Sequence, residues 1–189
     1  MLFSLYFLAI LGSVFFLIAI FYFIIVPFSS LINDLTRRNT APYVSSRRRA
    51  IKMMIKMADI KAGETVYDLG CGDGRLVFEA SKIKGSKCVG IEVNPCVFLL
   101  AWVKGKTLGS SAVIKKEDLF AMDLSQADVI FTYLLPRMMW ELEDKIIKEA
   151  GKNVRIIANS FEFKKLKCLK EERDGKIVVR EYSFSRIGV

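Results

Sequence analysis

The first part of the chain is an apolar segment long enough to cross a membrane. No charged residue occurs from Leu2 to Val26, and a helix of this length, rising about 1.5 Å per residue, crosses a hydrocarbon core of about 30 Å. A cleaved signal peptide would instead have a basic first region and an apolar stretch of about 7–15 residues, and both are missing. We therefore predict one retained transmembrane helix, in an anchor that covers residues 1–28.

Positive charge gathers on the carboxyl-terminal side of this segment. Residues 29–62 hold eight Lys and Arg against two acids, a net +6 of the chain's +9. The positive-inside tendency places the residues after Pro27 in the cytoplasm, or in the matrix if the protein is mitochondrial. Anionic lipid headgroups attract such a cluster by about 1 kcal/mol per charge, so we predict the bilayer, and not nucleic acid, as its partner. For Lys52 and Lys56 we expect an ordinary solvated helix face.

The chain has no histidine, and its four cysteines form no CxxC pair. A zinc site is therefore not expected, and we predict no metal. Without histidine, the usual Ser-His and Cys-His nucleophilic arrangements are also excluded. We expect the cysteines to be small buried residues in a reducing compartment; they are Cys71, Cys88, Cys96 and Cys168.

Short β-branched runs alternate with amphipathic stretches after residue 62. Such alternation is typical of an α/β fold, in which a parallel sheet carries helices on both faces. The length allows one domain of roughly 130 residues, which we place at residues 63–189. Strands are predicted near residues 65–69, 87–92, 112–116, 128–132 and 154–159, and helices near residues 74–83, 95–106 and 137–149.

Two further segments flank the alternating region. Residues 166–173 and 177–185 are predicted to form an antiparallel hairpin, because the Asp-Gly pair between them favours a two-residue turn. Residues 29–62 are predicted to hold a basic connector and then an amphipathic helix near residues 46–58, which a serine could cap. The expected fold is therefore a parallel sheet that ends in an antiparallel hairpin and is preceded by one transmembrane helix.

The sharpest local signal lies in residues 66–74 (VYDLGCGDG), where a predicted strand runs directly into a glycine-rich turn. Glycine permits unusual backbone angles and lets a ligand approach the backbone closely, so the pattern favours a nucleotide-like ligand over a simple surface turn. The dinucleotide fingerprint GxGxxG would need a small residue where this chain has Arg75. Asp68, just before the first glycine, would repel a pyrophosphate and attract a cation.

The DLGCGDG sequence resembles motif I of class I methyltransferases, a Rossmann-like family whose cofactor is S-adenosylmethionine. That cofactor carries an amino acid and a sulfonium instead of a pyrophosphate, which agrees with an acidic residue before the loop. The resemblance implies that Asp68 and the loop residues Gly70, Cys71, Gly72 and Gly74 line the methionine part of the cofactor.

Two later segments resemble other cofactor-binding parts of the same family. Glu92 ends the second predicted strand in GIEVNP, which also contains Asn94, and a carboxylate there can accept hydrogen bonds from both ribose hydroxyls. After the third strand, EDLF resembles the segment in which an Asp, here Asp118, binds the adenine amino group and apolar neighbours such as Leu119 flank the ring. An Asp at a strand end is also a common helix cap, so only the order of the motifs supports this assignment.

A larger part of the chain, residues 41–163, resembles a narrower family. APYVSS, the glycine loop, GIEVNP and YLLP are similar to the family that contains the mitochondrial ATP synthase c-subunit lysine methyltransferase and its prokaryotic relatives. This resemblance implies a protein lysine as substrate. The segment after the fourth strand is TYLLP and not the NPPY type of many amine and glutamine methyltransferases, so that motif assigns no substrate.

Two tyrosines are candidates for lining the methyl-transfer channel. Tyr133 follows the fourth strand and Tyr43 lies in the connector, and in either a ring face and a hydroxyl could hold an amine. Ordinary packing explains both equally well, and we expect Phe161 in the core. The anchor favours a membrane protein as substrate. The alternatives are a small-molecule or lipid methyltransferase, a non-catalytic membrane-tethered nucleotide-binding module, and an oxidoreductase, which Arg75 and Asp68 disfavour.

Overall fold

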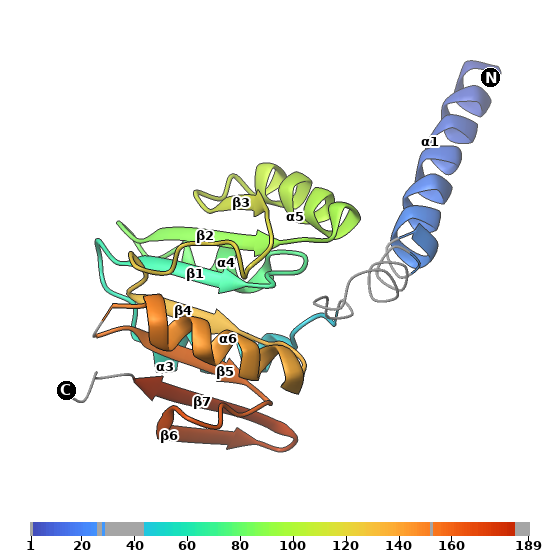
Figure 1. Ribbon diagram of the computed structural model, residues 1–189. Helices are drawn as coiled ribbons and strands as arrows, with labels where there is room; N and C mark the ends of the chain where they lie inside the picture. The colour runs from blue at the N-terminus through green and yellow to red at the C-terminus, as the bar shows by residue number, and fades with distance from the viewer. Residues whose placement is uncertain (1, 26–27, 29–43, 152, 184–189) are drawn as a thin grey trace. The chain divides into compact units, whose positions relative to one another are not determined.

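The computed structural model describes residues 2–25, 28, 44–151 and 153–183 of the chain (Figure 1). The chain divides into two compact units, Met1–Tyr43 and Val44–Val189. The first unit contains the long apolar helix, and the second contains the sheet with its covering helices.

Helix α1 (Leu2–Ile20) continues into a short π-helical turn, η1 (Phe21–Ile25). From Tyr6 to Ile25 the mean hydropathy is 2.8, and the helix is not buried in the fold. Among the described residues, this is the one helix whose length and composition would let it cross a membrane. Length and composition alone do not separate an anchor from a leader near the start of a chain, so the retained anchor stays a prediction.

The second unit is built on one seven-stranded sheet with the order β3-β2-β1-β4-β5-β7-β6. The first five strands in sequence are parallel, and β7 and β6 run antiparallel beside β5. The predicted parallel sheet with a terminal antiparallel hairpin is thereby confirmed. The strands are β1 (Thr65–Leu69), β2 (Lys87–Glu92), β3 (Val113–Lys116), β4 (Val129–Thr132), β5 (Arg155–Asn159), β6 (Lys167–Asp174) and β7 (Ile177–Ser183).

The position of a strand in the sheet matches how apolar it is. Strand β4 (VIFT) is buried along its whole length, and β1 is buried after its first residue, as expected for strands covered on both faces. The edge strands β3 and β6 are mostly exposed and carry charged side chains, which hinder pairing with another chain. The strand order changes direction between β1 and β4, and in such sheets ligands bind outside the carboxyl ends of the strands at this switch point.

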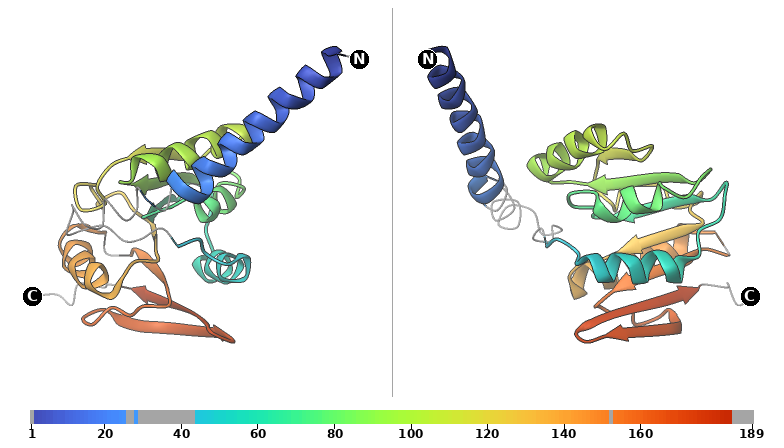
Figure 2. Two further views of the ribbon diagram at one scale, coloured as in Figure 1. Left: turned by 90° about the vertical axis from the view of Figure 1, so that its right-hand side faces the viewer. Right: turned by 180° about the vertical axis from the view of Figure 1, so that it is seen from behind.

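Helices cover both faces of the sheet (Figure 2). Helices α3, α4 and α5 lie on one face, and α6 lies on the other. Because α5 connects the parallel neighbours β2 and β3, it runs antiparallel to them. The bounds are α3 (Arg48–Ala58), α4 (Arg75–Ala80), α5 (Pro95–Thr107) and α6 (Pro136–Glu149).

Helix α3 is the amphipathic helix predicted near residues 46–58. Lys52 and Lys56 are exposed, which confirms the expected solvated face. The predicted serine cap is wrong, because Arg47 occupies the N-cap position and no side chain caps the helix. The residues that α3 buries are Ala50, Ile51, Met54, Met57 and Ala58.

Helix α4 is shorter than the helix predicted near residues 74–83, because the hydrogen bonding changes after its sixth residue. The Ser81 hydroxyl donates to the carbonyl oxygen of Phe78 (2.9 Å). Lys82 N and Ile83 N each donate to a carbonyl three residues earlier, which tightens the chain into turns.

The hairpin of β6 and β7 has its turn one residue later than the Asp-Gly pair. Asp174 still pairs with Ile177 as the last residue of β6. Gly175 therefore takes the first turn position, where its φ of +60° is left-handed and suits glycine.

All four cysteines are free thiols. Cys71 and Cys88 are buried as predicted, whereas Cys96 is partly buried and Cys168 is exposed, so the prediction is wrong for the last two. Cys168 lies on the edge strand β6, whose side chains are mostly exposed. Within the described part of the chain, no group of three or more Cys, Asp or Glu could hold a metal ion.

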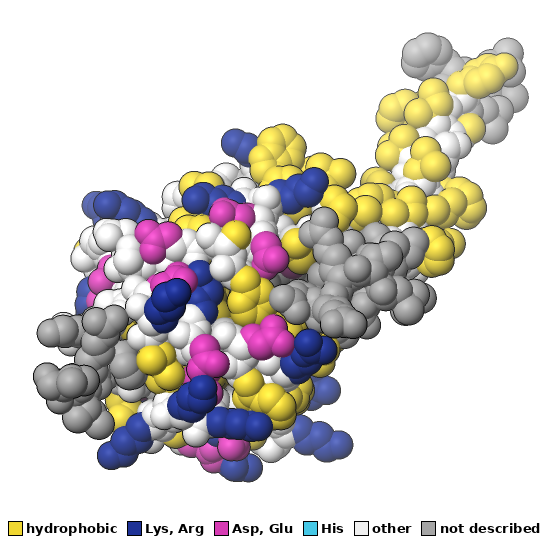
Figure 3. All heavy atoms as spheres, in the orientation of Figure 1, with side chains coloured by type: hydrophobic (Ala, Val, Ile, Leu, Met, Phe, Trp, Pro, Cys, Tyr) yellow, Lys and Arg dark blue, Asp and Glu magenta, His cyan; other side chains and the backbone are white. Residues whose placement is uncertain are grey.

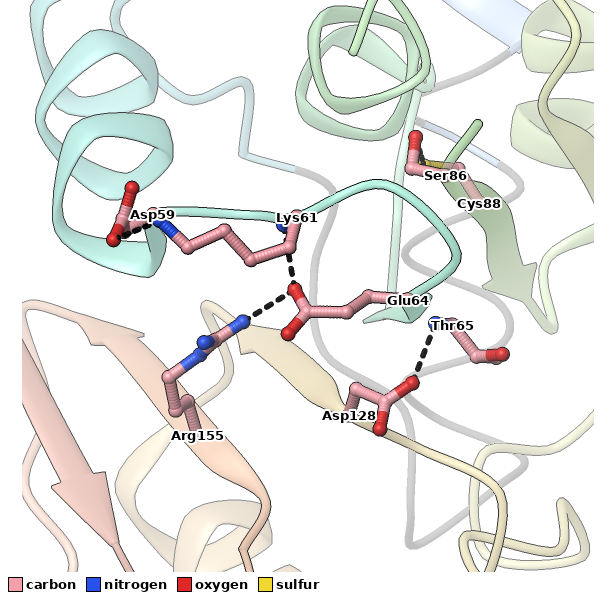
Figure 4. A network of polar contacts seen from close by, with 8 residues as sticks. All are labelled: Asp59, Lys61, Glu64, Thr65, Ser86, Cys88, Asp128 and Arg155. Carbon is pink, nitrogen blue, oxygen red and sulfur yellow. Dashed lines mark hydrogen bonds and ion pairs between the residues drawn. The ribbon is translucent and has the colours of Figure 1, made fainter. Parts of the chain in front are cut away.

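Polar contacts join the amino ends of β1, β4 and β5 (Figure 4). Glu64, just before β1, accepts a hydrogen bond from Lys61 N (2.7 Å) and pairs with the Arg155 guanidinium at the start of β5. Asp128, just before β4, accepts one from Thr65 N (2.8 Å), and its carbonyl accepts another from Arg155 N (3.0 Å). These contacts align the central strands at one edge, so that their carboxyl ends meet at the other.

We predict that Glu64→Gln lowers the free energy of unfolding by about 1–3 kcal/mol, because Arg155 is left half-buried without its charged partner. Glu141→Gln is the matched control, since Glu141 pairs with Arg137 on the exposed side of α6 and its loss costs less than about 0.5 kcal/mol. Urea unfolding of the chain in mild detergent measures both. Equal effects of the two substitutions would contradict this account of the edge.

Candidate active site

The loop after β1 has a backbone that only glycine adopts easily. Gly70, Gly72 and Gly74 have φ values of +78°, +57° and +79°. Gly70 N and Cys71 N both donate to the carbonyl oxygen of Ile91 in β2, at 2.9 Å each. The loop is therefore held across the carboxyl ends of β1 and β2.

Two of these glycines are also required by close packing. A Cβ on Gly70 would lie 2.8 Å from Leu134 Cδ2, so the loop touches the segment that follows β4. A Cβ on Gly74 would lie 2.5 Å from the Phe78 ring. Gly74 is thus explained by the packing of α4, and Gly70 by the contact of the loop with Leu134.

Asp68, in β1, is buried under the loop. Burial raises the pKa of its carboxyl to about 7, the nearby carboxylates of Glu92 and Asp73 add to the rise, and a hydrogen bond from the Val77 backbone opposes it. A negative charge at this position is costly unless a cation lies beside it. A cationic ligand beside Asp68 would remove that cost.

Glu92, at the end of β2, is fixed by the backbone on both sides. Its Oε2 accepts a hydrogen bond from Gly72 N (3.1 Å) and its Oε1 accepts one from Asn94 N (2.8 Å). Burial raises the pKa of this carboxyl, and the backbone hydrogen bonds oppose the rise. Each oxygen keeps a lone pair, so the carboxylate can still accept hydrogen bonds from two hydroxyls of a ligand.

Two predicted cofactor-binding residues use their side chains for the scaffold. Asn94 caps α5, with Oδ1 accepting hydrogen bonds from Cys96 N (3.0 Å) and Val97 N (3.3 Å). Cys71 points toward β2, where a Cβ on Gly90 would lie 2.9 Å from its sulfur, and burial raises the pKa of its thiol well above the usual range. The side chain of Cys71 is therefore turned toward the sheet, and only its backbone is left to contact a ligand at the loop.

The Asp118 segment lies beside Glu92, because Glu117 N donates to the carbonyl oxygen of Glu92 (3.2 Å). Asp118 is exposed, and its Oδ1 accepts a hydrogen bond from Phe120 N (2.9 Å), which is the local capping role common for an Asp at a strand end. Leu119 is buried. Oδ2 of Asp118 has no hydrogen-bond partner among the described residues and can accept one from a ligand.

Asp73, between two glycines of the loop, is a buried residue to which the sequence pattern assigned no role. Its Oδ2 contacts Arg75 Nε (2.7 Å) at the start of α4 and Lys104 Nζ (2.8 Å) in α5. The two cations compensate the buried charge and tie the loop to both helices. Because Lys104 is far away in the sequence, no local pattern predicts this contact.

An aromatic pair stands at the ends of β4 and β5. The rings of Tyr133 and Phe161 are stacked, with centroids 6.4 Å apart and planes 19° from parallel. Phe161 is only partly buried, so its predicted place in the core is wrong, and Phe163 packs there against Tyr182 instead. Tyr43, the other predicted channel residue, lies outside the described residues.

Phe161 reaches Tyr133 because of an unusual backbone at the preceding residue. Ser160 has a φ of +68°, and its N–H donates to the carbonyl oxygen of Val178 (2.8 Å) in β7. Its hydroxyl donates to Oδ1 of the buried Asn159 (3.1 Å). Such left-handed non-glycine residues are favoured at functional sites, and no sequence pattern reveals them.

A family model described as the ANTKMT methyltransferase domain matches residues 68–170, which include the glycine loop, Glu92, Asp118 and the aromatic pair. The chain belongs to this family.

Named relatives agree with this assignment. The protein-lysine N-methyltransferase of Saccharolobus islandicus is 32% identical over 126 residues, which cover 65% of this chain and 78% of that protein. The human ATP synthase c-subunit lysine N-methyltransferase is 34% identical over 131 residues, or 67% of this chain but only 54% of the human protein. An RNA methyltransferase from Salinibacter ruber, solved with S-adenosyl-L-homocysteine, matches with a TM-score of 0.73 at 25% identity, over 77% of this chain and 97% of that one.

The protein is therefore a methyltransferase that uses S-adenosylmethionine, as predicted from the motifs. The carboxyl edge of its sheet fits that cofactor in three respects. A buried acid, Asp68, suits the ammonium group of the amino acid moiety, Glu92 keeps acceptors for two hydroxyls, and the left-handed glycine loop leaves backbone open between them.

We predict that Gly70→Ala abolishes binding of S-adenosylhomocysteine and lowers the free energy of unfolding of the methyltransferase by about 1–3 kcal/mol. The added Cβ meets Leu134 Cδ2 at 2.8 Å and strains a left-handed backbone. Gly109→Ala is the control, because Gly109 also has a positive φ but open space around it. Calorimetric titration measures the affinity of both variants for S-adenosylhomocysteine, and thermal unfolding measures their stability. Normal binding by Gly70→Ala would rule out a cofactor seat along this loop.

Proposed function

We propose that this methyltransferase transfers a methyl group to a lysine ε-amino group in a protein segment at a membrane surface. The observation that carries the proposal is the match to a protein named as a protein-lysine N-methyltransferase, which covers 78% of that protein's length. The name of the human relative specifies a lysine of an ATP synthase component. The chain spans only 54% of that human protein. We therefore propose the substrate of this chain from its own site and do not assign it the substrate in the human protein's name.

The proposed seat of the cofactor follows the carboxyl edge from β1 to β3. Asp68 would face the cationic amino acid part, the backbone of Gly70, Cys71 and Gly72 would lie along it, and Glu92 would accept hydrogen bonds from the ribose. Asp118 would accept one from the adenine amino group, and the backbone near Asn94 and Leu119 would flank the ring. When bound, the cofactor supplies an activated methyl group on a sulfonium.

The acceptor lysine is proposed to enter between the cofactor and the stacked rings of Tyr133 and Phe161. Its aliphatic stem can pack on a ring edge, while a ring face favours the cationic head group. A lysine with a pKa of about 10.4 in water must lose a proton before attack, and partial burial beside the positive charge of the bound cofactor would lower that pKa. The chain then has to orient and desolvate the amine, and no strong base is required of it. Tyr43 remains proposed as a second residue that lines the methyl-transfer channel.

We further propose that residues 1–28 form a retained single-pass anchor, that residues 29–62 connect it to the domain, and that the methyltransferase domain, residues 63–189, faces the cytoplasm or the matrix. The hydropathy of Tyr6–Ile25 and the positive charge after it support this orientation. A tethered active site reaches mainly substrates near the bilayer. A loop of a membrane protein is therefore the proposed acceptor, and a lipid or small molecule is the alternative.

The test is transfer of an isotopically labelled methyl group to membranes from the source organism. The full chain should place label on lysine side chains of a membrane protein, identified by mass spectrometry of peptides, and Asp68→Asn should not. Label found only in lipid would favour the alternative substrate. A chain that binds S-adenosylhomocysteine and transfers nothing would support the non-catalytic module. Removal of residues 1–28 should spare cofactor binding and sharply reduce labelling.

We predict that Tyr133→Ala and Phe161→Ala each lower kcat/KM for the lysine substrate by about tenfold, or 1.4 kcal/mol, which is the scale of one amine–aromatic contact. The affinity for S-adenosylhomocysteine should stay unchanged, because the pair lies at the ends of β4 and β5 and not on the glycine loop. Tyr133→Phe is the control and should keep most of the activity. A parallel loss of cofactor affinity in both alanine variants would instead assign the pair a structural role.

A further inference from the structure

Helix α5 is apolar on both of its sides. The side that faces the sheet buries Val97, Ala101 and Gly105, and Gly105 is close-packed against the Phe78 ring. A surface helix normally turns polar residues outward, and a helix that is apolar all round is normally covered. The outer side of α5 therefore needs a partner.

Large apolar side chains form a stripe on this outer side. Leu99, Trp102 and Val103 are 46%, 45% and 49% exposed, and their i, i+3, i+4 spacing places them on one side of the helix. Leu108, just after α5, and Val113, in the edge strand β3, are 62% and 53% exposed. In Figure 3 apolar side chains gather at the top of the domain, where Figure 1 has α5, with basic side chains beside them.

Cations surround this stripe. The Lys106 Nζ lies 5.9 Å from the centroid of the Trp102 ring, and Lys115 and Lys116 are exposed on the neighbouring strand β3. A groove on the same face of the sheet runs from α5 to α3, and Glu79 is the one acid among the described residues that line it. The basic residues that line this groove are Arg48, Arg49, Lys52, Lys56, Arg75 and Lys104.

We propose that the α3–α5 face of the domain rests on the surface of a bilayer that contains anionic lipid. The apolar stripe of α5 enters the interfacial region, and the basic residues of α3 and β3 contact lipid headgroups. Tryptophan with neighbouring lysine is the composition expected at this interface, and the excess of cations complements anionic lipid better than it does another copy of this basic chain. Residues 26–43, which follow the proposed span, extend at most about 60 Å, so the domain stays within reach of the membrane.

This surface would also orient the active site, an inference that rests on the proposed function. Because α5 runs antiparallel to the strands, a bilayer against its outer side lies along the strands. The carboxyl edge, with Asp68 and Tyr133, then opens sideways, just above the membrane surface. A lysine on a short loop that emerges from the bilayer could reach it without leaving the interface.

The chain's two tryptophans provide the test, since Trp102 lies on α5 and Trp140 lies on α6, on the other face of the sheet. Trp140→Phe leaves Trp102 as the only tryptophan, and Trp102→Phe is the matched reverse variant. Each full-length variant is reconstituted into nanodiscs of phosphatidylcholine, with or without phosphatidylglycerol, whose acyl chains carry bromine close to the headgroup. Circular dichroism and binding of S-adenosylhomocysteine verify that both variants fold.

We expect strong bromine quenching and a blue-shifted emission for Trp102 in the discs with phosphatidylglycerol, weaker quenching without it, and little quenching of Trp140. Equal quenching of the two tryptophans, or none of Trp102 in a folded chain held by the disc, would overturn the proposal. Trp102 that is blue-shifted but unquenched would show that protein covers the stripe instead. A chain that does not co-migrate with the discs would overturn both this surface and the proposed anchor, whereas failure of methyl transfer alone leaves the fluorescence result unaffected.

Discussion

The buried carboxyl of Asp68 is the group on which the catalytic edge depends. The charges of the two neighbouring carboxylates are compensated. Asp73 contacts Arg75 and Lys104, and Glu92 accepts two backbone hydrogen bonds. The burial of Asp68 itself raises its pKa to about 7. Since this pKa lies above the ordinary value of about 3.9, the fold by itself favours the protonated acid and loses stability as pH rises from about 4 to about 7. A cationic cofactor would reverse that loss, so the same group that destabilises the fold would select the ligand.

The order of the strands turns this local chemistry into an active site. Contacts of Glu64 and Asp128 align the amino ends of the central strands, so their carboxyl ends meet at one edge. There β1 and β2 carry the carboxyls that we propose bind the cofactor, and Tyr133 and Phe161 follow β4 and β5. Leu134 packs against Gly70 and so joins the cofactor half of this edge, at β1 and β2, to the aromatic half, at β4 and β5. In the proposed reaction, the cofactor half supplies the methyl group and the aromatic half presents the amine.

Much of this could be predicted from the sequence because the responsible signals are local. Alternating apolar runs predicted the sheet, and the Asp-Gly pair predicted its hairpin. The glycine loop predicted a nucleotide-like ligand, and its resemblance to motif I implied S-adenosylmethionine. What was missed depends on contacts between distant residues or on backbone angles. Lys104 reaches Asp73 from another helix; Phe161 leaves the core because Ser160 adopts a left-handed φ of +68°. The sequence predicted a helix near residues 95–106, and only the structure shows that the exposed side of α5 carries Trp102 with other apolar side chains.

The measurement that tests the central claim most directly is the pH dependence of S-adenosylhomocysteine binding, followed by calorimetry in buffers of different ionisation enthalpy. If Asp68 must be ionised to hold the ammonium group of the ligand's amino acid part, affinity should rise by up to about tenfold per pH unit below about pH 7 and level off above it, with release of a proton on the acidic side. Asp68→Asn should bind weakly and without this pH dependence. An affinity that stays flat from about pH 6 to about pH 8, or the same slope in Asp68→Asn, would contradict the account.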